Sequence, residues 1–482
     1  MNTNIRRLGL FFLVAFGVIL ADITYWQVID ASSVAARPDN FRLGIQAAHV
    51  RRGLILDRNG QVLASRVIDR QGFVHRTYAD PSLSQTIGYD SPRYGKSELE
   101  QSYDDYLSGK VFGTSWRSLI NQWEHKQVVG DNLSLTIDDT LQRQVASLLP
   151  NTPSAAIVAD PRTGEILAMA SKPGFDANQI NNSTYWTSLL QDPNSPLINR
   201  ATSGYYPPGS TFKTLTLSAA LDTGTESLDS VFAGTQATGP LTVSGHVFPA
   251  KINNLAECFQ TPPVTLVTAF ACSDNIVYAE VGLRLGATQF LRYTSAFGLS
   301  QPTPFDIPVG VSHVTNVGGS FHDVDLAAAS FGQGQLHVTP LQMLMIDEAV
   351  ANNGAIEKPV LVKRVTAPDG AIVKQPSPSV LYTPISAATA SKVRDAMVNV
   401  VQTGSGYALK GLGIPAAGKT GTAEPGDGGR PHAWFIAFAP AEHPTVAVVV
   451  IVEHGGEGAL VAAPIACHIL QASLHAPGSC PS

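Results

Sequence analysis

The segment from Tyr206 to Lys213, with the sequence YPPGSTFK, constrains the local fold more than any other part of the chain. Its two consecutive prolines exclude a helix immediately upstream, and the glycine after them permits a sharp bend. Apolar residues then recur at helical spacing from Phe212, so the sequence predicts a turn followed by a helix of about four turns that ends near Gly224. Ser210 lies at the positive end of this helix, where a developing anion is stabilised.

Ser210 and Lys213 are three residues apart, so they share one face of the predicted helix. A serine hydroxyl becomes a good nucleophile when a neighbouring base removes its proton, and a buried lysine with a lowered pKa can be that base. The pattern Ser-x-x-Lys is a weak signal by itself, because a capping serine and a solvated lysine produce it equally well.

Two further short motifs follow in the chain, and together they strengthen this interpretation. They are Ser273-Asp274-Asn275 and Lys419-Thr420-Gly421-Thr422. Taken singly, the first is typical of a turn and the second of an exposed strand start. The ordered set, with its long second gap, resembles the serine penicillin-recognising enzymes and among them the class B penicillin-binding proteins. The resemblance extends over nearly the whole chain and is strongest to the actinobacterial cell-division branch.

The resemblance implies acyl transfer on the D-Ala-D-Ala end of a peptidoglycan stem peptide, and the same serine would be acylated by β-lactams. Ser210 would attack the carbonyl of the penultimate D-alanine, with Lys213 as the general base. Ser273 would relay a proton to the departing amine, while Asn275 would hold Lys213 and the substrate amide. Lys419 would fix the terminal carboxylate and shift the ionisation of its neighbours.

The residues that follow Lys419 would bind the substrate. Thr420 and Thr422 would offer hydroxyls to the terminal carboxylate, and Gly421 would leave room for a substrate strand along the sheet edge. The backbone N–H groups of Ser210 and Thr422 would form the oxyanion hole. We expect no metal and no other cofactor, since the twelve histidines show no ligand spacing.

The pattern of strands and helices predicts an α/β (α+β) transpeptidase domain over residues 132–482. Strands are expected at Leu133–Ile137, Ala155–Ala159, Glu165–Ala170 and Val446–Val452, and a helix at Thr140–Leu149 capped by Asp138 or Asp139. Strands at the two ends of the domain, with helices between them, favour an antiparallel sheet covered by helices, with an all-helical subdomain inserted.

The N-terminus predicts a membrane anchor over residues 1–28. The span Leu8–Val28 is long enough to cross a hydrocarbon core of ~30 Å, and Arg6 and Arg7 precede it. The N-terminus should therefore be cytoplasmic and the catalytic domain extracytoplasmic, in a single-pass cell-membrane protein. A cleaved signal peptide is the alternative, because Ser33-Val34-Ala35 is a passable cleavage site. The net charge of −6 and the lack of a basic run exclude a nucleic-acid partner.

Residues 29–131 are expected to form a small mixed domain that holds the catalytic domain off the membrane. Asn59-Gly60 predicts a hairpin turn between Leu54–Leu56 and Val62–Ala64. This dimerisation-like pedestal resembles that of class B penicillin-binding proteins. The resemblance implies docking to a lipid-II-polymerising glycosyltransferase of the RodA/FtsW type and to divisome proteins.

Four cysteines allow three disulfide pairings. Export makes disulfides reasonable, and the two short loops favour Cys258–Cys272 and Cys467–Cys480. Small buried thiols remain the alternative.

Three other functions share some of these features. A serine β-lactamase carries the same motifs, but the deacylating pattern Glu-x-x-Leu-Asn is absent from the sequence. A D,D-carboxypeptidase differs from a transpeptidase only in its acceptor. A non-catalytic septal scaffold would not need the full set of motif side chains, which this chain retains. The sequence therefore favours a transpeptidase.

Overall fold

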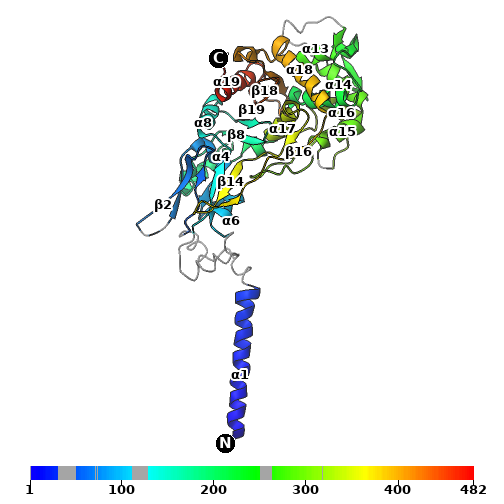
Figure 1. Cartoon of the computed structure of the whole chain (residues 1–482). Helices are drawn as coiled ribbons and strands as arrows, with labels where there is room; N and C mark the ends of the chain where they lie inside the picture. Colours follow the sequence, from blue (N-terminus) through cyan, green and yellow to red (C-terminus); the bar gives the residue numbers. More distant parts are fainter. Residues whose placement is uncertain are drawn as a thin grey trace.

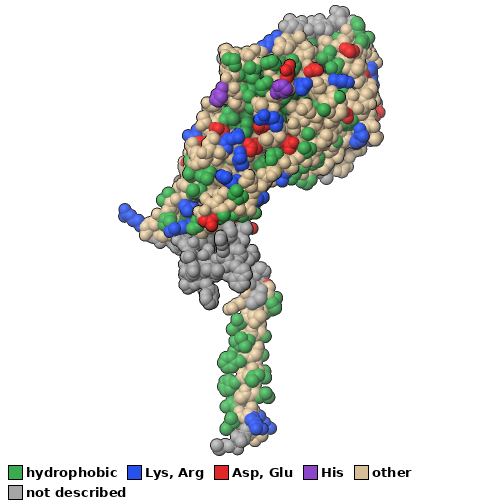
Figure 2. Space-filling view, in the orientation of Figure 1, with side chains coloured by type: hydrophobic (Ala, Val, Ile, Leu, Met, Phe, Trp, Pro, Cys, Tyr) green, Lys and Arg blue, Asp and Glu red, His purple; other side chains and the backbone are tan. Residues whose placement is uncertain are grey.

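The computed structural model of this protein describes residues 2–30, 50–70, 72, 74–110, 129–249, 263–316 and 318–481. Its first element is α1 (Asn2–Thr24), which continues as a π-helical turn over Tyr25–Ile29. The helix is long and apolar enough to cross a membrane, and none of the span Thr3–Gln27 is buried in the rest of the protein. It stands apart from the globular part (Figure 1), with hydrophobic side chains along its length and basic ones at its start (Figure 2).

A mixed six-stranded sheet lies on the side of the globular part that faces α1 (Figure 1), in the order β15-β14-β6-β1-β2-β3. Its strands are β1 (Ile55–Leu56), β2 (Val62–Ile68), β3 (Val74–Tyr78), β6 (Asn132–Leu135), β14 (Val362–Thr366) and β15 (Ile372–Lys374). The predicted hairpin at Asn59-Gly60 is confirmed, because Leu56 pairs antiparallel with Val62. β6 pairs with both β1 and β14, so the expected boundary between residues 131 and 132 runs through this sheet.

A buried ion cluster stabilises the N-terminal unit, which is the part of the protein built on β1, β2 and β3. Glu100 is fully buried and contacts Arg52 and Arg76, each at 2.6 Å. Burial raises the pKa of Glu100, but the charges of Arg76 and Arg52 outweigh it and lower that pKa. Through Arg52 and Arg76, the cluster joins the sheet to two short helices, α5 (Glu98–Ser102) and α6 (Asp104–Leu107). Two other short helices, η2 (Pro81–Leu83) and α4 (Ser84–Ile87), precede them in the chain. A small strand pair, β4 (Asp90–Ser91) with β5 (Gly95–Lys96), lies beside them.

The second sheet has five strands, all antiparallel, in the order β17-β18-β19-β7-β8. They are β7 (Ser154–Asp160), β8 (Glu165–Lys172), β17 (Ala417–Ala423), β18 (His432–Ala439) and β19 (Val446–Val452). These ranges confirm the strands expected near residues 155–159, 165–170 and 446–452. β18 and β19 are buried along their full length, as expected for a sheet covered on both faces. β17 is an edge strand.

Helices cover both faces of this sheet, as predicted. α8 (Asp139–Leu148) and α19 (Ala462–Leu474) share a hydrophobic cluster with Val448 on one face. α17 (Pro340–Ala351) packs with Val449 on the other. Asp138 caps α8, since its carboxylate accepts from Thr140 N at 3.0 Å.

The predominantly helical subdomain lies between β8 and β17 in the sequence. Its helices are α11 (Lys213–Asp222), α13 (Leu266–Ala271), α14 (Asn275–Leu285), α15 (Ala287–Ala296), α16 (Asp323–Ser330) and α18 (Ala387–Thr403). It is not purely helical, because it also contains the strand pairs β9 (Val231–Phe232) with β12 (Val264–Thr265) and β10 (Leu241–Val243) with β11 (His246–Phe248). The remaining elements are η4 (Ala177–Gln179), α9 (Ser183–Gln191), α10 (Arg200–Ser203), η5 (Gly209–Phe212), α12 (Thr235–Thr238), β13 (Ile356–Glu357), β16 (Val380–Tyr382) and η7 (Tyr407–Leu412).

One of the two expected disulfides is present as predicted. Cys467 and Cys480 are bonded and tie α19 to the C-terminal segment. Cys272 is also in a disulfide, but its expected partner Cys258 lies outside the described residues.

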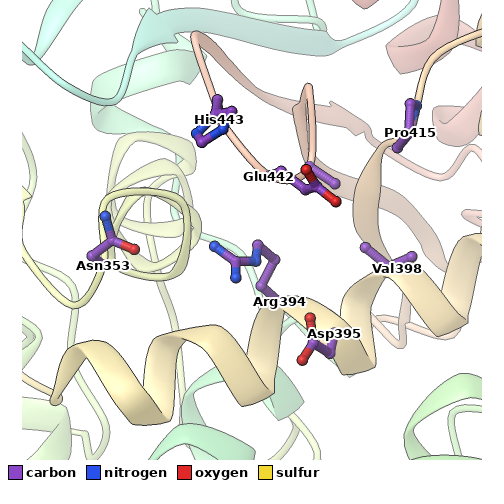
Figure 3. A pocket seen from close by; sticks show the side chains of 8 residues that line it. Asn353, Arg394, Asp395, Val398, Pro415, Glu442 and His443 are labelled. Carbon is purple, nitrogen blue, oxygen red and sulfur yellow. The ribbon is translucent and has the colours of Figure 1, made fainter.

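A cavity of about 570 Å³ opens between α18 and the loops around β17 and β18. Arg394 projects into it from α18, opposite Glu442 and His443 on the β18–β19 turn, with Asn353 and Pro415 at its sides (Figure 3). None of the three sequence motifs contributes to its walls, so the cavity that contains Ser210 is a separate one.

Candidate active site

The turn before Ser210 is fixed by close contacts with β17 and β18. Trp434 Nε1 donates a hydrogen bond to Pro207 O at 3.1 Å. Gly209 has a φ of 55°, and a Cβ at this position would lie 2.9 Å from Thr422 O. Only glycine adopts this backbone without strain while fitting against the strand. The turn therefore places Ser210 directly beside the edge strand.

The helix predicted from Ser210 begins as a 3₁₀ turn over Gly209–Phe212 and becomes α-helical at Lys213. In a 3₁₀ turn, side chains three residues apart eclipse each other. This brings Lys213 Nζ to 2.9 Å from Ser210 Oγ. The predicted contact between the Lys213 amine and the Ser210 hydroxyl is therefore present.

Lys213 is fully buried and has two further strong acceptors. Its Nζ donates to Ser273 O at 2.6 Å and to Asn275 Oδ1 at 2.7 Å. With Ser210 Oγ at 2.9 Å and Ser273 Oγ at 3.4 Å, four oxygens surround this nitrogen. A general base must be neutral when it accepts a proton, so the expected role needs Lys213 as the free amine at that step.

Ser273 lies between the two motif lysines. Its Oγ accepts a hydrogen bond from Lys419 Nζ at 2.8 Å and lies 3.4 Å from Lys213 Nζ. Its backbone is left-handed, with a φ of 63°, which costs a non-glycine residue roughly 1 kcal/mol or more. Asp274 holds this conformation by capping α14, because its carboxylate accepts from Ile276 N at 2.8 Å.

Lys419 is fully buried on β17. Burial lowers the pKa of its ammonium group to about 7. Its Nζ also donates to Thr420 O at 3.0 Å. A lysine of this kind is positively charged in only part of the molecules at neutral pH, so small changes in its surroundings change its protonation.

The hydroxyls of Thr420 and Thr422 have different environments. Thr420 is buried, and its Oγ1 lies 2.5 Å from Ser405 Oγ. Thr422 is exposed and lines the cavity of Ser210, and its Oγ1 accepts from Gly458 N at 3.3 Å. The two hydroxyls were both expected to face the substrate carboxylate, whereas in this structure the Thr420 hydroxyl is bonded to Ser405.

Gly421 faces the protein interior. A Cβ at this position would lie 2.9 Å from Pro208 O, 2.9 Å from Trp434 Cβ and 3.0 Å from Thr211 Cγ2. From the sequence, glycine was expected here to leave room for a substrate strand. The structure gives a different reason for the glycine. The missing side chain lets the nucleophile turn pack against β17.

Ser210, Asn275 and Thr422 open onto one cavity of about 170 Å³. The other residues that line it are Phe248, Pro249, Ile276, Phe331, Gln333 and Glu424. The sequence did not assign these residues to the site, although Glu424 lies only two residues after the third motif. Phe248 comes from the β10–β11 hairpin and contacts Phe331 edge to face, with ring centroids 5.8 Å apart. Nothing in its local sequence indicates this role.

The arrangement provides a nucleophile, a candidate base and a second proton carrier in one continuous hydrogen-bond chain. It runs from Ser210 Oγ through Lys213 Nζ to Ser273 Oγ and Lys419 Nζ. Such a chain suits acyl transfer, which needs a proton taken from the nucleophile and another given to the leaving group. Among the described residues, no group of three or more His, Cys, Asp or Glu side chains could hold a metal ion.

Comparison with known proteins decides the family. The transpeptidase domain of penicillin-binding proteins matches residues 154–471, and the penicillin-binding protein A dimerisation domain matches residues 52–133. This chain is a class B penicillin-binding protein of the penicillin-binding protein A type. It is 34% identical to the peptidoglycan D,D-transpeptidase PbpA of Mycolicibacterium smegmatis, over 98% of this chain and 99% of the relative. The PbpA of Mycobacterium tuberculosis is 33% identical with the same coverage.

Solved structures of similar proteins agree with this assignment. The penicillin G acyl-enzyme complex of penicillin-binding protein A from M. tuberculosis has a TM-score of 0.79 and 33% identity. It is matched over 88% of this chain and 99% of that one. A ceftriaxone acyl-enzyme complex of the same protein has a TM-score of 0.80 and 32% identity, with 89% and 100% covered. The predicted fold, family and resemblance to the actinobacterial branch are therefore confirmed.

Proposed function

We propose that this penicillin-binding protein is a membrane-anchored peptidoglycan D,D-transpeptidase that cross-links stem peptides through an acyl-enzyme on Ser210. The observation that carries the proposal is the buried Lys213 Nζ, 2.9 Å from Ser210 Oγ and in contact with the second motif. The names of the mycobacterial relatives and the acyl-enzyme complexes support the same reaction and its inhibition by β-lactams.

In the first half-reaction, neutral Lys213 takes the proton of Ser210 while Oγ bonds to the carbonyl carbon of the penultimate D-alanine. The backbone N–H groups of Ser210 and Thr422 stabilise the oxyanion, and such a donor is typically worth about 3 kcal/mol. The bond to the terminal D-alanine then breaks, and its nitrogen receives a proton through Ser273. Lys419 holds the carboxylate of the departing residue. An ester on Ser210 remains.

In the second half-reaction, an amine of a neighbouring stem attacks the ester carbonyl. The amine gives up a proton, a new amide bond forms, and Ser210 Oγ leaves and is reprotonated. The same lysines serve both half-reactions, because a group that accepts a proton in one step can donate it in the reverse step. Asn275 holds Lys213 at 2.7 Å and thereby keeps its position through the cycle.

The organisation of the chain supports a division into three parts, with the anchor at 1–28, the pedestal at 29–131 and the transpeptidase domain at 132–482. The arginines before the span favour a cytoplasmic N-terminus and an extracytoplasmic catalytic domain. Stem peptides attached to lipid II are the substrates. A lipid-II-polymerising glycosyltransferase and divisome proteins are the expected partners in cell division, because the chain has no sequence feature of a polymerase domain of its own.

The test is the intact mass of the full chain in detergent after addition of a labelled penicillin. The unmodified protein should gain one stable adduct, and Ser210→Ala should gain none because the nucleophilic oxygen is absent. Ser203→Ala is the matched control, since this nearby serine on α10 is outside the cavity, and it should react like the unmodified protein.

Other outcomes would select the alternatives. Rapid turnover of penicillin without a lasting adduct would contradict slow deacylation and indicate a β-lactamase-like hydrolase. Release of D-alanine without cross-linking to an added amine acceptor would indicate a carboxypeptidase. Folded protein with neither an adduct nor turnover would refute the catalytic proposal and favour a scaffold.

A further inference from the structure

Two aromatic rings lie beside the two motif lysines. Lys213 Nζ lies over the ring of Tyr278, 5.5 Å from its centroid. Lys419 Nζ lies over the ring of Phe270 at the same distance, and the two rings contact each other with centroids 5.9 Å apart. All four residues are fully buried. The proposed reaction uses both lysines and neither ring.

Helix α14 presents both a polar group and the Tyr278 ring to the same nitrogen. Asn275 and Tyr278 are three residues apart on α14, so they share one face of the helix. Asn275 Oδ1 accepts a hydrogen bond from Lys213 Nζ at 2.7 Å, and the ring of Tyr278 faces that nitrogen as well. The contact of the second motif with Lys213 therefore continues into the next turn of the helix.

The hydroxyl group of Tyr278 is not a proton carrier in this arrangement. Its oxygen is buried and has no hydrogen-bond partner among the described residues. Burial, together with the charge of Asp274, raises the pKa of Tyr278 well above its usual value of 10, so the phenol keeps its proton. The part of Tyr278 that acts on Lys213 is therefore the face of its ring.

The face of an aromatic ring distinguishes the two protonation states of a lysine. It carries partial negative charge, so it attracts an ammonium group and has little attraction for a neutral amine. The attraction is stronger in a buried site than at the surface. Lys213 becomes an ammonium group when it takes the proton of Ser210. The ring of Tyr278 thus stabilises the charge that burial of Lys213 disfavours.

From this geometry we propose that Tyr278 is a positioning residue whose ring face stabilises the ammonium form of Lys213 during acylation. The inference rests on the proposed function, in which Lys213 is the general base. Two other charged groups act near Lys213. They are Asp274 at the start of α14 and Lys419 on β17, which contacts the same Ser273 hydroxyl. A test that alters only the ring leaves both of them in place.

Fluorinated rings of the same shape test the proposal on the full chain in detergent. Tyr278→Phe keeps the ring face, and 4-fluoro-, 3,5-difluoro- and 3,4,5-trifluorophenylalanine at position 278 withdraw its negative charge in steps. The measurement is the pH at which benzylpenicillin acylates the protein fastest, because this optimum depends on the pKa values of the groups that exchange protons. We expect Tyr278→Phe to keep the optimum of the unmodified protein. Across the fluorinated series the optimum should move to lower pH by roughly half a unit, because a weaker ring face lowers the pKa of Lys213.

The same series at Phe297 is the matched control. Phe297 directly follows α15 and is fully buried, and no cation of the described part of the chain lies over its ring. Fluorination there should leave the optimum unchanged, even where it changes the Tm, since a loss of packing lowers the rate without moving the optimum.

Three outcomes would overturn the inference while leaving the proposed function intact. The optimum would stay constant across the Tyr278 series, would move as far with Tyr278→Phe as with the trifluoro ring, or would move equally in the Phe297 series. A folded, unmodified protein that benzylpenicillin does not acylate at any pH would refute the proposed function and this inference with it.

Discussion

At the scale of single residues, the site depends on two buried lysines whose surroundings differ. Lys213 is surrounded by four acceptor oxygens, from Ser210, Ser273 and Asn275. Lys419 has two, from Ser273 and Thr420, and burial lowers its pKa to about 7. A protein retains such a destabilising charge when the charge serves binding or catalysis.

Replacement of Lys419 by methionine should therefore stabilise the protein while abolishing acylation. The folded state lowers the pKa of Lys419 from 10.5 to about 7, so the cost to folding is complete below pH 7 and disappears as the pH approaches 10.5. We expect Lys419→Met to gain about 2 kcal/mol at pH 6.5, after the loss of its hydrogen bonds, and much less at pH 9.5. Thermal unfolding at both pH values measures this. A gain in Tm that does not shrink with rising pH would contradict it.

At the scale of elements, the nucleophile turn and β17 act as one packed unit. Gly209 and Gly421 both let backbone atoms approach where a Cβ would need neighbours to move, against Thr422 on one side and Pro208 and Trp434 on the other. The distance between Ser210 and the edge strand is therefore set by two glycines. The proposed oxyanion hole takes its donors from both elements, so we expect this spacing to affect the rate of acylation.

Gly421→Ala should separate the two elements slightly. The added methyl group meets backbone and tightly packed atoms at 2.9 to 3.0 Å, and overpacking of this kind typically costs about 1–3 kcal/mol. We expect a small fall in Tm and a fall of at least tenfold in the rate of penicillin acylation. Gly174→Ala is the control, because a Cβ there meets nothing closer than 3.7 Å. An unchanged acylation rate in Gly421→Ala would show that the spacing is not critical.

At the scale of the whole molecule, buried polar contacts join the N-terminal unit, built on β1, β2 and β3, to the five-stranded sheet. Gln85 Nε2 donates to Pro173 O at 2.7 Å, and Thr86 Oγ1 donates to Met169 O at 3.2 Å. Glu98 is a strained residue beside this joint, with a φ of 50° and a carboxylate oxygen that is buried without a hydrogen-bond partner. Burial raises the pKa of Glu98 to about 8.

Glu98→Gly should strengthen the joint. Glycine adopts a positive φ without strain, and the buried carboxyl group is removed. Because the folded state raises the pKa of Glu98 from 4.5 to about 8, the carboxyl group destabilises folding progressively between those pH values. The Tm advantage of Glu98→Gly should thus grow from pH 5 to pH 8. Glu98→Gln keeps the strained backbone without the charge, so it should gain less. An advantage that is the same at every pH would refute the role of the charge.

Much of this protein followed from local sequence. The turn and helix at Ser210, the hairpin at Asn59-Gly60 and the buried strand Val446–Val452 each depend on patterns within a few residues, and each is confirmed. The span at Leu8–Val28 was found for the same reason, since length and apolar composition suffice. The three motifs were recognisable because their order in the chain carries the family resemblance.

Only the tertiary structure decided the contacts between segments far apart in the chain. It paired β6 with β14, placed Ser273 between two lysines, bonded Thr420 to Ser405 and brought Phe248 and Glu424 to one cavity. None of these has a local signature, because strand pairing and side-chain contacts depend on how distant segments pack. The sequence by itself determined which chemical groups the site could use, and the packing of the sheet and helices determined which of those groups meet.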